Sequence, residues 1–425
     1  MIQTTGTTQC ETLVKEFTYV RNLTMRITEP LETEDYVVQS MSDVSPPKWH
    51  MAHTTWFFED FILNTFVDGY EYRFEATRKL FNSYYETLGK PFPRHQRGLL
   101  SRPTVNEIID YRKAVDKEMT SFLSDPENLT DEILSLLEIG LQHEQQHQEL
   151  LITDVKYNFS INPLHPVFHP KPLSPVETSA PPMKWLRFEG GVAEVGTNEE
   201  HFSFDNERPE HKVYLYPFSI ASRPVTNGEY ISFIEEGGYS DPKYWLSEGW
   251  AIVNQKGWQA PLYWEHVNGE WFYFTMHGYK KVEPNEPVTH ISFYEADAYA
   301  RWEGCRLPSE HEWETAFKNR PVSGQFLESM DFHPAFDEDQ SPYGSVWDWT
   351  RSPYTPYPES ARPDGALGEY NAKFMSNQMV LRGGSCATPD NHVRVTYRNF
   401  FHPDKRWQFS GIRLAKDETG HDENR

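Results

Sequence analysis

The sequence has few cysteines, no long apolar stretch and no leader-like segment at its start. Its three cysteines, Cys10, Cys305 and Cys386, are far apart and odd in number, which argues against a disulfide framework and suits a reducing cytoplasm. The mean hydropathy is −0.70, and no apolar run is long enough to cross a bilayer. The segment Met1–Thr5 has neither the basic nor the apolar region of a signal peptide. These absences predict a cytoplasmic protein that does not bind membranes.

Basic residues are also scarce. The chain has 40 Lys and Arg against 63 Asp and Glu, which gives a formal net charge of −23 and a pI of about 5.2. Nucleic acids and anionic membranes are bound through clustered Lys and Arg, so we expect neither as a partner. Hydrophobic residues make up 38% of the chain and aromatic residues 15%, enough for buried cores. A chain of 425 residues usually forms two domains.

The first part of the chain has the pattern of a helical bundle. Four stretches carry apolar residues at helical spacing: Glu11–Arg26, Pro46–Phe66, Thr104–Leu123 and Thr130–Tyr157. Thr104 and Thr130 are each followed by acidic residues, as is typical of helix N-caps. Bundles commonly bind metals between facing helices. We therefore predict a four-helix bundle over residues 1–162.

The sequence changes character after residue 162. Seven prolines lie between 163 and 182, and such a stretch cannot continue a helix, so it is predicted to be a linker. Residues 183–416 contain short alternating segments, much Gly, Trp and Tyr, and a few helices, which is typical of a loop-rich α+β domain. Residues 417–425 form a polar tail. The predicted fold class is therefore multidomain, α followed by α+β.

Several histidines are spaced in a way that is typical of metal ligands. His143 and His147 are four residues apart, and four residues advance an α-helix by roughly 400°, so both project from nearly the same face. Gly140, one turn earlier, is expected to leave space beside this pair. A third imidazole could come from His50 or His53, and the spacing alone leaves both open. The pattern predicts a metal site between two helices.

The same segment also matches the H-E-x-x-H motif of zinc hydrolases, in which Glu144 would be the general base. Those enzymes need a third ligand downstream. The next histidines, His165 and His169, lie in the proline-rich stretch. A zinc hydrolase is therefore the weaker alternative.

The second half carries six phrases that resemble the formylglycine-generating-enzyme/sulfatase-modifying-factor domain, a variant of the C-type lectin-like fold. They are Arg223–Tyr230, Pro287–Ala296, Arg306–Glu314, Gly344–Trp349, Leu381–Ser385 and Gly411–Arg413. Their glycines suit tight turns, and their Trp and Arg residues suit the packing of a fold with little regular structure. Enzymes of this family that generate formylglycine bind copper through a cysteine pair after the Gly-Gly-Ser phrase. Here Cys386 stands alone after Ser385, so copper-dependent sulfatase maturation is not expected.

The first half resembles the DinB-like four-helix bundle, and the two domains in this order resemble the iron sulfoxide synthases of ergothioneine biosynthesis (EgtB type). The ovothiol and selenoneine synthases are relatives of this group. The resemblance implies a facial site for Fe(II) made by His53, His143 and His147, with His53 rather than His50 matching the family's Ala-His phrase. Three neutral imidazoles would leave open positions at which both substrates and O₂ could meet.

The implied reaction joins a cysteine-type thiol to N-α-trimethylhistidine (hercynine) and oxidises the sulfur to a sulfoxide with O₂. The thiol would be cysteine or γ-glutamylcysteine. A synthase of the ovothiol or selenoneine type is the alternative within the same architecture. A metal-free, lectin-like binding module on a structural bundle is the alternative from another class. The oligomeric state is left open.

The resemblance also implies roles for other residues. Tyr84 or Tyr85 would donate a proton or hydrogen atom, and the choice between them stays open. Arg94 and Arg97, three residues apart, would bind the carboxylate of the thiol substrate. The remaining substrate contacts would be Gln146, to the imidazole, and Asn399, Phe400 and Phe401, to the trimethylammonium and carboxylate groups.

The chain departs from part of the family at Phe400-Phe401, where some relatives have Trp-Asp. This difference removes an anionic partner for the substrate cation. Together with the Tyr84-Tyr85 pair, it resembles the branch that uses free cysteine. The sequence therefore favours cysteine over γ-glutamylcysteine as the thiol.

Overall fold

The computed structural model describes residues 2–74, 76–83, 85, 89–170, 180–336, 339–361 and 371–418. The chain divides into two compact units, the first built from residues up to Phe168 and the second starting at His169. Tyr84, residues 171–179 of the expected linker and residues 419–425 of the expected tail lie outside the described residues.

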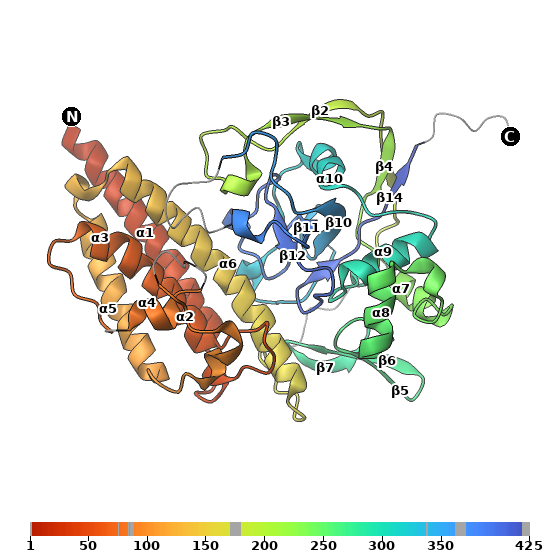
Figure 1. Ribbon diagram of the computed structural model, residues 1–425, viewed down its shortest axis with the longest axis horizontal. Coiled ribbons are helices and arrows are strands. Elements are labelled where there is room, and N and C mark those ends of the chain that lie inside the picture. The colour runs from red at the N-terminus through yellow and green to blue at the C-terminus, as the bar shows by residue number, and fades with distance from the viewer. Residues whose placement is uncertain are drawn as a thin grey trace. The chain divides into compact units, whose positions relative to one another are not determined.

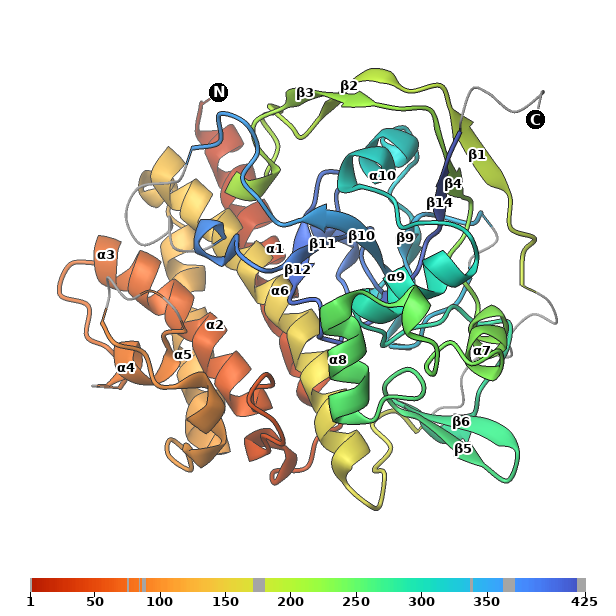
Figure 2. The same ribbon diagram turned by 45° about the vertical axis from the view of Figure 1, so that its right-hand side comes forward.

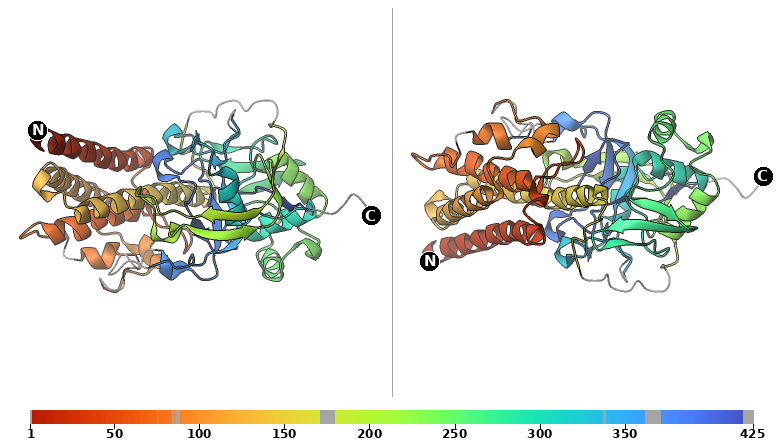
Figure 3. Two further views of the ribbon diagram at one scale, coloured as in Figure 1. Left: turned by 90° about the horizontal axis from the view of Figure 1, so that it is seen from above. Right: turned by 90° about the horizontal axis from the view of Figure 1, so that it is seen from below.

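The first unit is a bundle of long helices that run side by side (Figures 1 and 3). The long helices are α1 (Ile2–Thr28), α2 (Pro47–Phe58), α5 (Val105–Leu123) and α6 (Asp131–Ile161). Helices α1 and α2 each pack against both α5 and α6, so they occupy opposite corners of the bundle. Short elements connect them: η1 (Asp35–Val37), the π-helical turn η2 (Glu59–Leu63), α3 (Asn64–Phe66), α4 (Thr77–Phe81), η4 (Arg94–Leu99) and η5 (Pro126–Asn128). The predicted four-helix bundle is confirmed.

The predicted helix starts are also present. The Thr104 hydroxyl accepts a hydrogen bond from the Glu107 backbone N–H at 3.3 Å, and the Glu107 carboxylate accepts one from the Thr104 N–H at 2.7 Å. The Thr130 hydroxyl accepts a hydrogen bond from the Ile133 N–H at 3.3 Å. Each cap satisfies backbone donors that the first helical turn leaves unpaired. No described helix is both long and apolar enough to cross a membrane.

Gly140 lies where aromatic side chains of helix α2 pack directly against helix α6. A Cβ atom at this position would lie 2.6 Å from Cε1 of Phe58 and 3.0 Å from Cε1 of Phe57. The space beside Gly140 is therefore filled by two aromatic rings of α2. The expectation that this glycine leaves room next to the histidine pair was wrong, because the missing side chain serves helix packing.

We expect Gly140→Ala to destabilise the protein by about 1–3 kcal/mol, since a Cβ would force the Phe58 ring to move. Alanine is the better helix former, so propensity alone predicts the opposite sign. Ser135→Ala, at an exposed position of the same helix, is the matched control and should leave the melting temperature unchanged or slightly raised. A Gly140→Ala variant as stable as this control would contradict the close approach.

The second unit consists of small sheets and short helices connected by long loops (Figures 1 and 2). Its helices are α7 (Asn227–Glu235), α8 (Ser247–Lys256), α9 (Phe293–Trp302) and α10 (Glu310–Phe317). Its single helical turns are η6 (Asp205–Glu207), η7 (Pro242–Tyr244), η8 (Leu327–Ser329), η10 (Ala372–Phe374) and η11 (Asp390–His392). The α+β prediction is confirmed.

The described strands form five sheets. The strands are β1 (Trp185–Phe188), β2 (Gly191–Val195), β3 (His211–Leu215), β4 (Phe218–Ala221), β5 (Trp264–Val267), β6 (Glu270–Thr275), β7 (Gly278–Lys281), β8 (Gly324–Gln325), β9 (Tyr343–Gly344), β10 (Trp347–Pro353), β11 (Met379–Arg382), β12 (Asn399–Phe401), β13 (Ser410–Gly411) and β14 (Ala415–Asp417). They pair in the orders β1-β4-β14, β12-β11-β10-β13, β2-β3, β5-β6-β7 and β8-β9. The β12-β11-β10-β13 sheet is antiparallel except for the parallel pair β10–β13.

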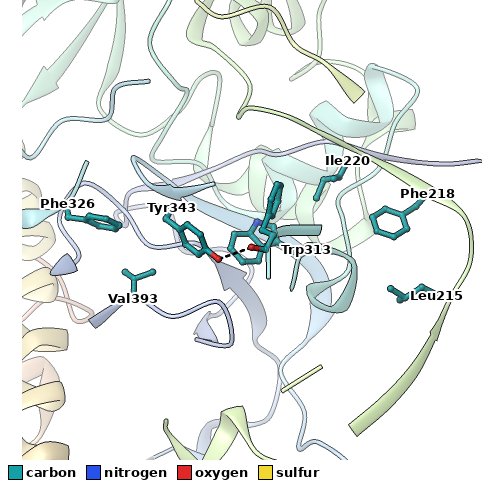
Figure 4. Packing of buried hydrophobic residues seen from close by; sticks show 8 residues of the cluster. Leu215, Phe218, Ile220, Trp313, Phe326, Tyr343 and Val393 are labelled. Atoms are coloured by element: carbon teal, nitrogen blue, oxygen red, sulfur yellow. Dashed lines mark hydrogen bonds between the residues drawn. The ribbon is translucent and has the colours of Figure 1, made fainter. Parts of the chain in front are cut away.

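Residues from three of the six phrases meet in the interior of this unit. Trp313 packs at the centre of a buried apolar cluster that includes Phe218, Ile220 and Tyr343 (Figure 4). The indole N–H of Trp313 and the guanidinium of Arg413 both donate to Oδ2 of Asp348, at 2.8 and 2.5 Å. Three phrases distant in the sequence are thus linked at one buried carboxylate. Such a network compensates for the scarcity of regular structure.

Candidate metal centre

Three histidine side chains converge inside the helical unit. His53 comes from α2, and His143 and His147 come from α6. One ring nitrogen from each lies within 4.8 Å of the others, and His53 Nε2 is 3.1 Å from His143 Nε2. Two unprotonated nitrogens repel each other at this distance unless a proton or a cation lies between them. The triangle formed by one ring nitrogen from each of His53, His143 and His147 therefore fits a metal ion.

The ring of His53 is held in one orientation. Its Nδ1–H donates to the backbone carbonyl of Phe81 at 2.5 Å, which leaves the lone pair on Nε2. The ring is stacked between two indoles: Trp49 at 4.5 Å and Trp56 at 5.7 Å between centroids. Helix α2 is buried along its whole length, so water does not compete for these contacts. His53 thus presents Nε2 toward the other two imidazoles.

His50 occupies a different place. Its Nδ1 lies 2.8 Å from Nδ1 of His147, and its Nε2 lies 3.1 Å from Oδ2 of Asp154. Both nitrogens of His50 are therefore engaged outside the triangle. The spacing in the sequence left His50 and His53 as equal candidates, whereas the convergent set contains His53.

Burial keeps the three rings neutral. It lowers the pKa of His143 to about 3 and holds the pKa values of His53 and His147 well below their ordinary value, with neighbouring imidazoles adding to the effect for these two. A histidine binds a metal ion through a neutral nitrogen lone pair. At neutral pH these rings need not release a proton first. The donor set is three nitrogens without a carboxylate.

Glu144, between the two histidines of α6, is not part of the triangle. Its carboxylate is fully buried and accepts from the Thr24 hydroxyl at 2.6 Å, from Arg21 Nη1 at 2.7 Å and from Arg112. Burial alone would raise the pKa of Glu144, but the two guanidinium groups outweigh it and lower the pKa to about 2. Arg21 also pairs with Asp116 at 2.6 Å. Glu144 therefore ties α1, α5 and α6 together.

This placement disfavours the zinc-hydrolase alternative. A general base needs a lone pair that can reach a water molecule on the metal. Both oxygens of Glu144 are already occupied, and its proton affinity is very low. The contacts of Glu144 are those of a structural anion, which disfavours the general-base role that the H-E-x-x-H motif suggested.

Tyr85 is buried near the histidines, whereas Tyr84 lies outside the described residues. The Tyr85 ring is 5.9 Å from Trp56 and 5.4 Å from Phe61. Its backbone is fixed by Asn82, whose side chain accepts from the Tyr85 N–H at 2.9 Å and donates to its carbonyl at 2.8 Å. Tyr85 thus contacts an indole that itself stacks on His53.

Arg94 and Arg97 differ in their surroundings. Arg94 is exposed and donates to the backbone carbonyl of Asp43. Arg97 is buried, with 3% exposure, and its guanidinium lies 3.3 Å from the Trp49 ring centroid. It donates to the hydroxyls of Ser45 and Ser83, both at 2.9 Å, and forms no ion pair with any described residue. Burial, assisted by the charge of Arg94, lowers the pKa of Arg97 well below its ordinary value.

The other expected site residues lie in both units. Gln146 is half-buried on α6, directly before His147. Asn399, Phe400 and Phe401 form β12, which pairs with β11 in the second unit. Phe400 stacks on Tyr354 at 4.1 Å between centroids, and Phe401 meets Trp407 edge-on at 5.7 Å.

Some groups around the histidines were not anticipated from the sequence. Asp154 lies seven residues after His147, two helical turns along the same face, and this spacing could have indicated it. Trp49 and Trp56 lie four and three residues from His53 on the buried helix α2, and this spacing accounts for their stacking on its ring. Nothing in the sequence pointed to Arg21 or Arg112 as partners of Glu144, because these contacts join distant helices.

Two families match the chain. Residues 172–337 and 341–418 match the sulfatase-modifying factor enzyme 1-like domain, and residues 16–151 match the DinB superfamily. The first match covers more than half of the chain. The second contains all three convergent histidines.

Individual relatives are similar over about half of this chain. It is 36% identical over 262 residues to the hercynine oxygenase of Mycolicibacterium smegmatis, covering 54% of this chain and 60% of that protein. It is 35% identical over 254 residues to the hercynine oxygenase of Mycobacterium tuberculosis, covering 53% and 59%. It is 28% identical over 234 residues to ergothioneine biosynthesis protein 1 of Schizosaccharomyces pombe, covering 51% and 28%. The matched regions thus span less than two thirds of each relative.

Proposed function

Because the chain belongs to the family of the sulfatase-modifying factor enzyme 1-like domain, we propose that it is an Fe(II)- and O₂-dependent sulfoxide synthase of ergothioneine biosynthesis. In this reaction a cysteine-type thiol forms a C–S bond to the imidazole carbon between the two ring nitrogens of hercynine. The thiol and that carbon each lose one hydrogen. One oxygen atom of O₂ enters the sulfoxide and the other leaves as water.

The observation that carries the proposal is the convergence of His53, His143 and His147 in a chain similar to two hercynine oxygenases. When bound, Fe(II) would supply the activation of O₂ and a position for the thiolate. Three neutral imidazoles add no negative charge to the site, which favours an anionic sulfur substrate. His53 and His143 are buried and His147 is partly buried, which limits the access of water to the three ligand nitrogens.

Arg97 is the proposed partner of the thiol substrate's carboxylate. The guanidinium of Arg97 is buried without an ion-pair partner among the described residues, which is unfavourable, and a bound carboxylate would relieve that cost through charge-assisted hydrogen bonds. The stacking of Arg97 on Trp49, and of Trp49 on His53, supports a location close to the metal ligands. Arg94 is exposed, so in this proposal it contributes mainly through its charge.

The remaining roles are proposals of the same kind. Tyr84 or Tyr85 would donate a proton or hydrogen atom, and the contact of Tyr85 with Trp56 supports a position near the histidines. Gln146, adjacent to His147, would hydrogen-bond the hercynine imidazole. Asn399, Phe400 and Phe401 would bind the trimethylammonium and carboxylate groups, since aromatic faces attract a cation that cannot donate hydrogen bonds. We propose cysteine as the thiol, on the basis of the Tyr-Tyr and Phe-Phe pairs.

The test is an aerobic incubation of the iron-loaded protein with hercynine and either cysteine or γ-glutamylcysteine, followed by mass analysis for the sulfoxide. We expect product with cysteine and a requirement for Fe(II) that Zn(II) does not satisfy. Product only with γ-glutamylcysteine would contradict the thiol assignment. Product only with unmethylated histidine would indicate an ovothiol-type synthase, and no product with any pair would overturn the proposed function.

A further inference from the structure

His50 connects His147 to a buried carboxylate. Its two ring nitrogens lie 2.8 Å from Nδ1 of His147 and 3.1 Å from Oδ2 of Asp154. His50 is 3% exposed and Asp154 is 1% exposed. Oδ2 of Asp154 also accepts from the Ser45 backbone N–H at 2.7 Å, which fixes the carboxylate in place. A chain of three side chains therefore runs from the convergent histidines into the bundle.

The carboxylate determines where the protons in this chain lie. Asp154 is an acceptor, so Nε2 of His50 must carry a proton, and Nδ1 of neutral His50 is then an acceptor. His147 must consequently donate its Nδ1–H to His50, which leaves the lone pair of His147 on Nε2. The reverse arrangement would place an unprotonated His50 Nε2 against a carboxylate. Among the neutral tautomers of His50, only the first assignment satisfies both contacts.

We propose that His50 and Asp154 are positioning residues for the metal centre, acting through His147. This inference rests on the metal site of the proposed function. We call the pair His50–Asp154 the relay. The relay selects the His147 tautomer whose Nε2 is free to bind the metal, holds the His147 ring in place and increases the basicity of Nε2. The Phe81 carbonyl does the same for His53, so two of the three rings are oriented by an acceptor behind them.

A purely structural hydrogen bond is the competing explanation, and the same helix provides a matched control. Asn158, one turn after Asp154, is also buried, and its side-chain oxygen accepts from the Ser40 hydroxyl at 2.6 Å and from the Ser40 N–H at 3.1 Å. It anchors the connection between α1 and α2 in the way that Asp154 anchors Ser45. No contact joins Asn158 to the histidines among the described residues.

The experiment measures binding of Co(II) to the full-length apoprotein by chelator competition, together with the visible spectrum of bound Co(II) and the melting temperature of the apoprotein. The variants are His50→Leu, His50→Asn, Asp154→Asn and the control Asn158→Ala. We expect His50→Leu to weaken Co(II) affinity by about 10–100-fold and to change the spectrum. His50→Asn places an amide oxygen near the position of Nδ1 and should restore most of the affinity. Asp154→Asn should weaken binding by about 10-fold, and Asn158→Ala should lower only the melting temperature.

Each outcome bears on the proposal. Wild-type affinity and spectrum in either His50→Leu or Asp154→Asn would overturn the relay, and Asp154→Asn keeps this test available if His50→Leu does not fold. An equal loss of affinity in Asn158→Ala would assign the effect to general loosening of the bundle and would also overturn it. A wild-type protein that binds no Co(II) would overturn the metal centre, and with it the proposed function and the relay.

Discussion

His53→Asn is expected to lower the affinity for Fe(II) by about 10³-fold or more, equal to about 4 kcal/mol, and to abolish sulfoxide formation. The variant removes Nε2, the nitrogen that lies 3.1 Å from His143 Nε2. The asparagine amide can still donate to the Phe81 carbonyl in place of Nδ1–H, so the hydrogen bond behind the ring is retained. With two ligands left, the site loses one side of its coordination. Metal content per chain and product yield by mass are the measurements.

His95→Asn is the control for this variant, since His95 is an exposed histidine of the same unit. It should keep full metal content and full product yield. The apoprotein melting temperatures of both variants should lie close to that of the wild type. A His53→Asn protein that still binds one Fe(II) per chain with unchanged affinity would exclude His53 as a ligand.

Glu144→Gln is expected to destabilise the helical unit by about 3 kcal/mol or more, because it leaves Arg21 and Arg112 buried without their shared carboxylate. A loss of this size corresponds to a decrease of the melting temperature by about 10 °C for a unit of this length. Glu132→Gln, at an exposed position of the same helix, is the matched control and should change stability by less than about 1 kcal/mol. Near-normal stability with complete loss of activity would instead support Glu144 as a catalytic base.

Glu144 also predicts a dependence of stability on pH. Its pKa falls from an ordinary value of 4.5 to about 2 in the folded protein. A lowered carboxyl pKa contributes stability that is fully present above pH 4.5 and is lost as the pH falls toward 2. That contribution, about 3 kcal/mol, should be absent in Glu144→Gln. The stability difference between wild type and variant should therefore shrink as the pH decreases through this window.

Local patterns accounted for much of the helical unit. The starts of α5 and α6 followed from Thr104 and Thr130, because an N-cap depends only on residues within one turn. The co-facial placement of His143 and His147 followed from helix geometry. The resemblances to a DinB-like bundle and to a sulfatase-modifying factor domain are confirmed, since both rest on residue types at fixed positions in the chain.

Contacts between helices could not be predicted in this way. Gly140 was expected to leave room beside the histidines, but its missing side chain accommodates Phe57 and Phe58 of another helix. Glu144 fitted a hydrolase motif, yet its environment is set by Arg21 and Arg112, which lie far away in the sequence. In both cases the local pattern was compatible with two roles, and the packing of distant helices allowed only one.

The amino-acid sequence by itself determined the order of the two domains, the helical positions of the HxxxH pair and the absence of a paired cysteine after Ser385. These properties depend on composition and on spacing within one element. Only the tertiary structure decided that His53 meets His143 and His147 while His50 turns toward Asp154. Residues three apart on a helix point in similar directions. Which contacts each of the two histidines makes therefore depends on the residues that the neighbouring helix places opposite it.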